Sequence, residues 1–312
     1  MALDQMNAPE RWRNALDESE FEKNMRREAP VFANINLLGR CNVDCYFCLG
    51  KDIETEFKKQ NQLAVHFSKW VNFEQYLLKC EQAGIRRIYV TGQNTDSLMY
   101  RYLGELVEHV QSRGFDVGLR TNGYLAHKNM EVINQCRRNV GYSIHSLDPE
   151  TNWKIMHRRD LPDWERIIPA TRNTRVSVVL NRYNEHEFMD LLKYISRFEN
   201  VAYIQARRIC TDTREAFLIE DVRVYERVFE AVKREYPLIG YFYGAEIFSM
   251  FDKEVCFWRT VKTTIESFNY YTDGTINDEY FVIEGYMREA QSYPRLGGIP
   301  VKIEGLEGYW RG

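Results

Sequence analysis

Six short apolar runs rich in β-branched residues recur along the chain, and stretches with helical periodicity separate them. The runs are Val31–Leu38, Arg86–Thr91, Phe115–Arg120, Val140–Ile144, Arg175–Leu180 and Val201–Ala206. Apolar residues at helical spacing run from Phe73 to Cys80, from Leu103 to Val110, from Phe188 to Ile195 and from Tyr225 to Val232. Strands that alternate with helices pair in parallel through right-handed crossovers. The pattern therefore predicts an α/β fold, either an open doubly wound sheet or a curved barrel.

Two segments of different composition flank this alternating region. Residues 1–30 are polar with scattered apolar positions, which predicts an N-terminal helical segment. Residues 31–236 hold the alternating strands and helices. Residues 237–312 are rich in aromatic residues and glycine, and the pair Asp273-Gly274 between β-prone runs predicts a hairpin. We expect this last segment to be a β and loop extension that covers one opening of the α/β region.

Composition disfavours several classes of partner. The net charge is −3, so no field attracts nucleic acid or an anionic membrane surface. No apolar run approaches the length of a membrane span, and the N-terminus does not resemble a secretory signal. Seven cysteines, three of them clustered, fit a reducing compartment better than a disulfide framework. We expect a cytoplasmic protein that binds neither nucleic acid nor membranes.

Three cysteines, Cys41, Cys45 and Cys48, stand at C-x₃-C-x₂-C spacing directly after the first predicted strand. Three thiolates on one loop can hold an iron–sulfur cluster of four irons and leave one iron without a protein ligand. An open iron can bind a substrate or cosubstrate. A zinc site and a chance cluster of buried thiols are the alternatives, but zinc usually takes four ligands in two separated pairs, and the chain has no second pair.

The spacing of these cysteines, with the aromatic Phe47 just before the last one, resembles the signature of the radical S-adenosylmethionine (radical SAM) superfamily. The resemblance implies a [4Fe–4S] cluster whose open iron chelates SAM, and reductive cleavage of SAM to a 5′-deoxyadenosyl radical that takes hydrogen from a substrate. It also implies a partial (β/α)₆ barrel with the cluster loop after the first strand. An electron donor such as flavodoxin or ferredoxin would be a partner.

The resemblance further implies which side chains line the SAM site, since that site lies at the C-terminal ends of the strands. With Phe47, they are Gly92, Asn94 and Thr95 after the second strand, Thr121 and Asn122 after the third, Ser143 and His145 at the fourth, Asn184 after the fifth and Arg207 on the sixth. Purely structural roles remain open for some of these residues and their neighbours. Thr95 or Asp96 could cap a helix, and so could Asp148. Arg207 could form a surface ion pair.

The segment Thr91–Asp96 departs from the Gly-Gly-Glu-Pro sequence that the family often has there, and only Gly92 is kept. The variant resembles radical SAM enzymes that act on sugars, aminocyclitols and nucleosides in antibiotic pathways. It favours a small hydroxyl-rich substrate and a place in natural-product biosynthesis. A peptide-modifying maturase is the alternative, and a structural iron–sulfur or zinc protein without turnover is a third.

Hydrogen abstraction leaves four outcomes open: epimerisation, dehydration, dehydrogenation or cyclisation. Besides the clustered thiols, Cys80 and Cys136 lie in predicted packing, and Cys210 and Cys256 are too few for a second cubane. We therefore predict a single cluster. An epimerase needs a hydrogen donor opposite the radical, and Cys256 or Cys210 could supply it, although a free cysteine also serves as a small buried hydrophobe.

Overall fold

The computed structural model describes residues 32–48, 61–209, 215–242, 245–258 and 267–277, and within them eleven strands form one sheet. All six predicted strands are present, with ends within two residues of those expected. They are β1 (Phe32–Leu38), β2 (Arg87–Gln93), β3 (Asp116–Thr121), β4 (Val140–Ser143), β5 (Thr174–Val179) and β6 (Val201–Arg207). They pair in parallel in chain order, which confirms the α/β fold.

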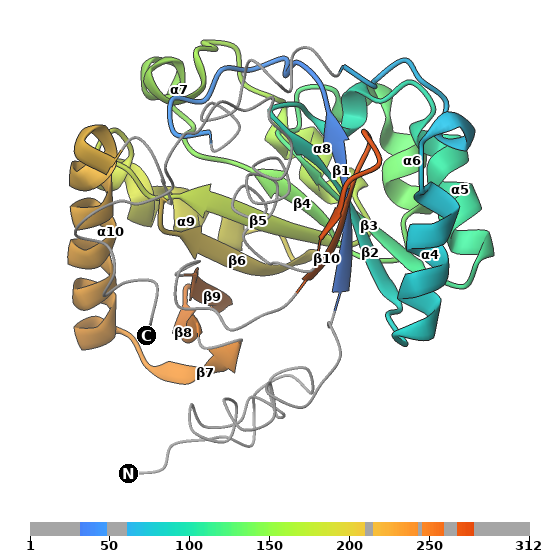
Figure 1. Cartoon of the computed structure of the whole chain (residues 1–312). Coiled ribbons are helices and arrows are strands. Elements are labelled where there is room, and N and C mark those ends of the chain that lie inside the picture. The colour runs from blue at the N-terminus through green and yellow to red at the C-terminus, as the bar shows by residue number, and fades with distance from the viewer. Residues whose placement is uncertain (1–31, 49–60, 210–214, 243–244, 259–266, 278–312) are drawn as a thin grey trace.

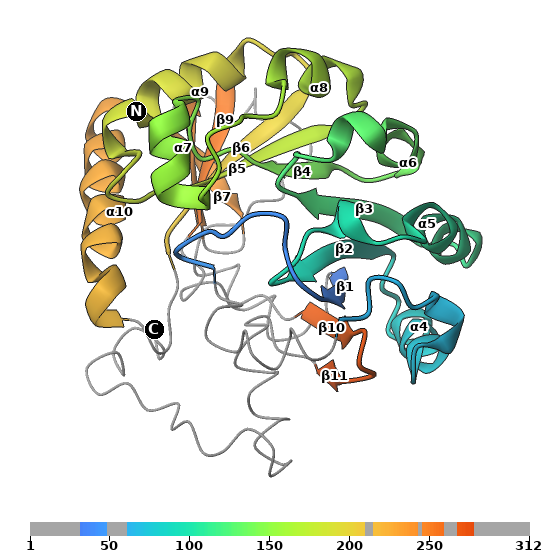
Figure 2. The same ribbon diagram turned by 90° about the horizontal axis from the view of Figure 1, so that it is seen from above.

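Helices cover the outer side of the curved sheet (Figure 2). The predicted helical faces became α4 (Phe73–Gln82), α5 (Leu103–Ser112), α9 (Phe188–Ser196) and α10 (Glu215–Glu235). Additional helices are α6 (Met130–Gln135), α7 (Pro149–Met156) and α8 (Trp164–Ala170), with single turns η2 (Phe67–Lys69), η3 (Ser97–Met99), η4 (Ala126–Lys128) and η5 (Glu185–Glu187). The curvature and the outer helices agree with the expected partial barrel (Figure 1).

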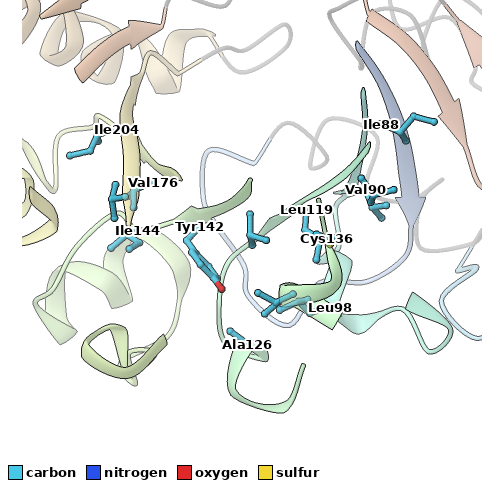
Figure 3. Packing of buried hydrophobic residues seen from close by; sticks show 14 of the residues in the cluster. Ile88, Val90, Leu98, Leu119, Ala126, Cys136, Tyr142, Ile144, Val176 and Ile204 are labelled. Atoms are coloured by element: carbon cyan, nitrogen blue, oxygen red, sulfur yellow. The ribbon is translucent and has the colours of Figure 1, made fainter. Parts of the chain in front are cut away.

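The main hydrophobic core lies between the strands and the outer helices. Figure 3 shows Val90 of β2, Leu119 of β3 and Val176 of β5 in this layer. Because side chains alternate along a strand, the residues between these positions point to the other, concave face of the sheet. Across β1 to β5 that face carries polar residues such as Asn36 of β1 and Ser177 of β5. At the far edge of the sheet the same face carries a small apolar cluster of Ala245, Ile247, Cys256 and Trp258. The part of the barrel interior lined by β1 to β5 is therefore suited to hydrogen bonding.

The described part of the C-terminal extension adds strands to both edges of the sheet. On one side, β7 (Leu238–Phe242), β8 (Ala245–Met250) and β9 (Lys253–Trp258) form an antiparallel meander whose last strand runs parallel to β6. On the other, β10 (Ser267–Tyr271) runs parallel to β1 and turns into β11 (Ile276–Asn277). This turn is the predicted hairpin, with Gly274 at a φ of +95°.

Two expectations about the chain ends concern segments outside the described residues. The N-terminal helical segment, residues 1–30, is one of them. The other is the cover over the barrel opening, since residues 259–266 and 278–312 of the extension also lie outside. Both stay predictions. In the part of the chain that the structure describes, no helix is both long enough and apolar enough to span a membrane.

Candidate functional site

The loop Cys41–Cys48 follows β1 and carries its three cysteine thiols half-buried. Main-chain hydrogen bonds fix it against the C-terminal end of α7. The amide of Asp44 donates to the carbonyl of Met156 over 3.0 Å, and that of Tyr46 donates to the carbonyl of Ile155 over 3.1 Å. Hydrogen bonds to α7 therefore fix the loop at two positions between its first and last cysteines.

A buried carboxylate ties the same loop to α10. The hydroxyl of Tyr46 donates to Asp221 Oδ1 over 2.9 Å, and Arg182 donates to the Asp221 carboxylate through its main-chain amide, Nε and Nη2. Asp221 is fully buried, between Leu218 and Tyr225 on the apolar face of the helix. Sequence reasoning missed this residue. The signal was present, because a carboxylate on the apolar face of a helix needs a buried partner.

A second buried carboxylate organises the turn after β3. Asp96 accepts hydrogen bonds from Thr121 Oγ1 over 2.9 Å and from the amide of Asn122 over 2.6 Å, and it also caps η3. Burial raises the pKa of Asp96 to about 6. The turn points Asn122 at the cluster loop, where its Nδ2 lies 3.7 Å from Cys41 Sγ and 2.8 Å from Asn42 Oδ1. Asp96 was expected only as a helix cap, and it also positions Asn122.

The turn after β2 folds tightly back on its own strand. A Cβ on Gly92 would lie 2.0 Å from the carbonyl oxygen of Thr95, so only glycine leaves room for this approach. Asn94 occupies the left-handed region at a φ of 54°. Thr95 Oγ1 donates to the carbonyl of Arg40 over 3.0 Å. The turn therefore touches the residue directly before the first cysteine.

We expect Gly92→Ala to weaken SAM binding by about tenfold or more. A β-carbon this close to a main-chain oxygen forces the turn to move, and overpacking of this kind costs about 1–3 kcal/mol. Titration of the cluster-loaded protein with SAM measures the effect. Gly104→Ala on α5 is the matched control, since its Cβ would meet only the Val132 side chain, at 3.3 Å. Unchanged SAM affinity in Gly92→Ala would contradict the assignment.

His145 sits between the cluster loop and the ends of β4 to β6. Its ring meets Phe47 edge to face with centroids 5.2 Å apart. Its Nδ1 accepts a hydrogen bond from the amide of Val179 over 3.1 Å, so the neutral ring carries its proton on Nε2. Burial, together with the charge of Arg207, lowers the pKa of His145 to about 3. His145 is therefore a fixed neutral donor at working pH.

The remaining predicted site residues are placed as follows. Asn184 is fully buried and donates to the carbonyl of His145 over 2.8 Å, so it positions the histidine. Ser143 and Arg207 are half-buried at the ends of β4 and β6. Cys256 is fully buried on β9. Cys210 lies outside the described residues.

The donor set fits the cluster that the cysteine spacing implies. Three half-buried thiols at the end of β1 can bind three irons of a cubane and leave the fourth open, and Asn122 offers a hydrogen bond to the sulfur of Cys41. In the described ranges, no three His, Cys, Asp or Glu side chains are arranged to hold a single metal ion. Cys80 and Cys136 are buried in packing, as expected.

The family model of the radical SAM superfamily matches residues 35–195, just over half of the chain. The chain belongs to the radical SAM superfamily. It is therefore a radical SAM enzyme that uses a [4Fe–4S] cluster and SAM, and enzymes of this superfamily need a reductant. The match begins within β1 and ends within α9, so it includes the cluster loop and β2 to β5.

The curated relatives are named GTP 3′,8-cyclase. The protein from Aquifex aeolicus (strain VF5) is 28% identical over 169 residues, which cover 51% of this chain and 51% of the relative. The protein from Microcystis aeruginosa is 28% identical over 138 residues, 43% of this chain and 40% of the relative. The chain thus spans about half the length of the curated relatives it matches. The similarities do not support the antibiotic-pathway subgroup or a role in natural-product biosynthesis.

Among solved structures, Streptococcus suis SuiB has a similar fold. The TM-score is 0.56 at 12% sequence identity, and the match covers 83% of this chain and 63% of SuiB. At this identity the likeness supports the fold alone. It agrees with the partial barrel expected from the sequence.

Proposed function

We propose that this radical SAM enzyme abstracts hydrogen from a small hydroxyl-rich metabolite, such as a sugar, an aminoglycoside or a nucleoside, bound inside the barrel. The observation that carries the proposal is a ladder of amides across the concave face of β10, β1 and β2. Asn34 Nδ2 donates to Asn269 Oδ1 over 2.9 Å, and Gln93 Nε2 donates to Asn36 Oδ1 over 3.2 Å. Amides both donate and accept hydrogen bonds, as substrate hydroxyls do.

The chain's own residues have distinct parts in this reaction. When bound, the cluster and SAM supply the 5′-deoxyadenosyl radical that takes a hydrogen atom from substrate carbon. Asn122 fixes the cluster loop at Cys41. The tight turn at Gly92 forms the side of the site next to that loop. His145 keeps a hydrogen-bond donor on Nε2 because its Nδ1 accepts from the amide of Val179, and a pKa near 3 keeps the ring neutral. These groups orient the reactants and need no proton of their own to move.

Two further features of the proposal concern partners. A reductant of the flavodoxin or ferredoxin class would deliver the electron. The curated relatives' name specifies GTP, whose ribose hydroxyls place it within the proposed substrate class. A peptide is the second candidate substrate, because SuiB, with a similar fold at a TM-score of 0.51, has been solved bound to the precursor peptide SuiA.

A substrate screen tests the proposal. We expect a sugar, an aminoglycoside or a nucleotide, with GTP among the compounds, to stimulate formation of 5′-deoxyadenosine by the reduced, cluster-loaded protein. The measurement is 5′-deoxyadenosine by liquid chromatography, with and without each compound. Stimulation by a peptide alone would replace the proposal with the maturase. A protein that binds SAM yet never forms 5′-deoxyadenosine would favour a structural role.

A further inference from the structure

Two arginine side chains meet over a glycine on the concave face of the sheet. Arg120 of β3, Gly141 of β4 and Arg175 of β5 are register partners on adjacent strands. A Cβ on Gly141 would lie 2.8 Å from Arg175 Nε and 3.0 Å from Arg120 Cδ. The absence of a side chain at Gly141 is thus what allows both arginines to lie across β4. They share one place in the barrel interior.

Neighbouring residues fix the position of Arg120. Its guanidinium lies over the ring of Tyr89, 3.9 Å from the ring centre, and its Nη1 donates to Asn139 Oδ1 over 3.1 Å. A second glycine makes room for that ring, since a Cβ on Gly118 would come within 2.5 Å of it. Two glycines on adjacent strands therefore accommodate one aromatic ring and two guanidinium groups.

Among the described residues, neither arginine of this pair forms an ion pair with a carboxylate, and the side chains that accept their hydrogen bonds, Asn139 and Gln205, are neutral. Arg175 is 5% exposed, its Nη1 donates to the amide of Gln205, and its Nε has no hydrogen-bond partner in the part of the chain that the structure describes. Burial, together with Arg175, lowers the pKa of Arg120 to about 10. Keeping two like charges together in this way is costly unless an anion joins them.

We propose that Arg120 and Arg175 bind an oxyanion carried by the substrate, a phosphate or a carboxylate. The inference rests on the proposed function, in which the barrel interior holds the substrate. Guanidinium groups bind both oxyanions through paired N–H donors, and the unpartnered Nε of Arg175 supplies such a donor. Cys256 is the register partner of Gln205, so the anion lies beside the thiol considered as a hydrogen donor.

Calorimetric titration of the cluster-loaded full chain with inorganic phosphate, and separately with malonate, tests the site. We expect one of the two to bind and Arg175→Gln to weaken its binding by about tenfold or more, because the variant removes a charge-assisted hydrogen bond to the anion. Arg175→Lys should lose less, because it keeps the charge but not the fork. Arg197→Gln, at an exposed arginine paired with Glu165, is the control and should bind as the unaltered protein does.

The outcomes separate this inference from the proposed function. Phosphate binding points to a phosphorylated substrate and malonate binding to a carboxylated one. The inference is overturned if neither anion binds, or if Arg175→Gln binds as tightly as the unaltered protein. If circular dichroism shows that Arg175→Gln does not fold, Arg175→Lys and Arg120→Lys replace it. Binding by both lysine variants as tight as that of the unaltered protein then overturns the inference. If neutral and phosphorylated or carboxylated forms of one substrate stimulate SAM cleavage equally, the inference fails and the proposed function stands. If the protein binds the anion but no small molecule stimulates SAM cleavage, the proposed function fails and the anion site stands.

Discussion

Replacing any one of Cys41, Cys45 and Cys48 with alanine is expected to abolish 5′-deoxyadenosine formation. Each thiolate would bind a different iron of the cubane, so its loss would leave the cluster under-ligated, and the loop offers no spare cysteine. The unaltered protein, reconstituted without oxygen, should hold about four irons per chain. Iron analysis, the visible absorption of the cluster and 5′-deoxyadenosine formation measure the effect together.

The matched control is Cys136→Ala, because Cys136 is a buried cysteine that packs beside α6 away from the cluster loop. It should keep its iron and its activity, with at most a modest loss of stability. A triple variant of the three loop cysteines that still holds a full cluster would contradict the assignment. A colourless, air-stable protein loaded with zinc would do so as well.

The strands and most of the large helices could be predicted because their signals are local. A short apolar run rich in β-branched residues marks a buried strand, and apolar residues at helical spacing mark a helix with one buried face; the six strands and four helices were predicted in this way. The edges of the sheet could not be predicted in this way. Asn34 of β1 bonds to Asn269 of β10, 235 positions further along the chain. Nothing in the pattern of either strand shows that they pair.

The cluster loop was predictable from its spacing, whereas the residues that position it were not. Asp96 looked like a cap, and its bonds to Thr121 and Asn122 arise only when β2 and β3 lie side by side. Arg120 and Arg175 stood at the ends of their predicted strands, and a charged residue at such a position is easily taken for the end of the strand. Both lie within paired strands on the polar face, so alternation along the strand was the signal that could have found them.

Replacing Cys256 with alanine is expected to leave SAM cleavage and hydrogen abstraction intact and to abolish epimer formation, if the reaction is an epimerisation. Cys256 lies fully buried on the same face as Gln205, and burial raises its pKa, so the thiol keeps its hydrogen. The S–H bond can give that hydrogen atom to a substrate carbon radical and leave a thiyl radical. One electron from the reductant and one proton then restore the thiol.

Product analysis of the reaction run in D₂O measures this step. The exchangeable thiol should place deuterium on the inverted carbon in the unaltered protein, and Cys256→Ser, which keeps the shape but has a stronger bond to hydrogen, should yield 5′-deoxyadenosine and no epimer. Cys80→Ala is the control, since Cys80 is buried on α4 in the outer core.

Cys210 is the other candidate donor and lies outside the described residues. Full product from both Cys256→Ala and Cys210→Ala would eliminate a thiol donor and shift the reaction toward dehydration, dehydrogenation or cyclisation, leaving Cys256 as a small hydrophobe packed against Ile247 and Trp258.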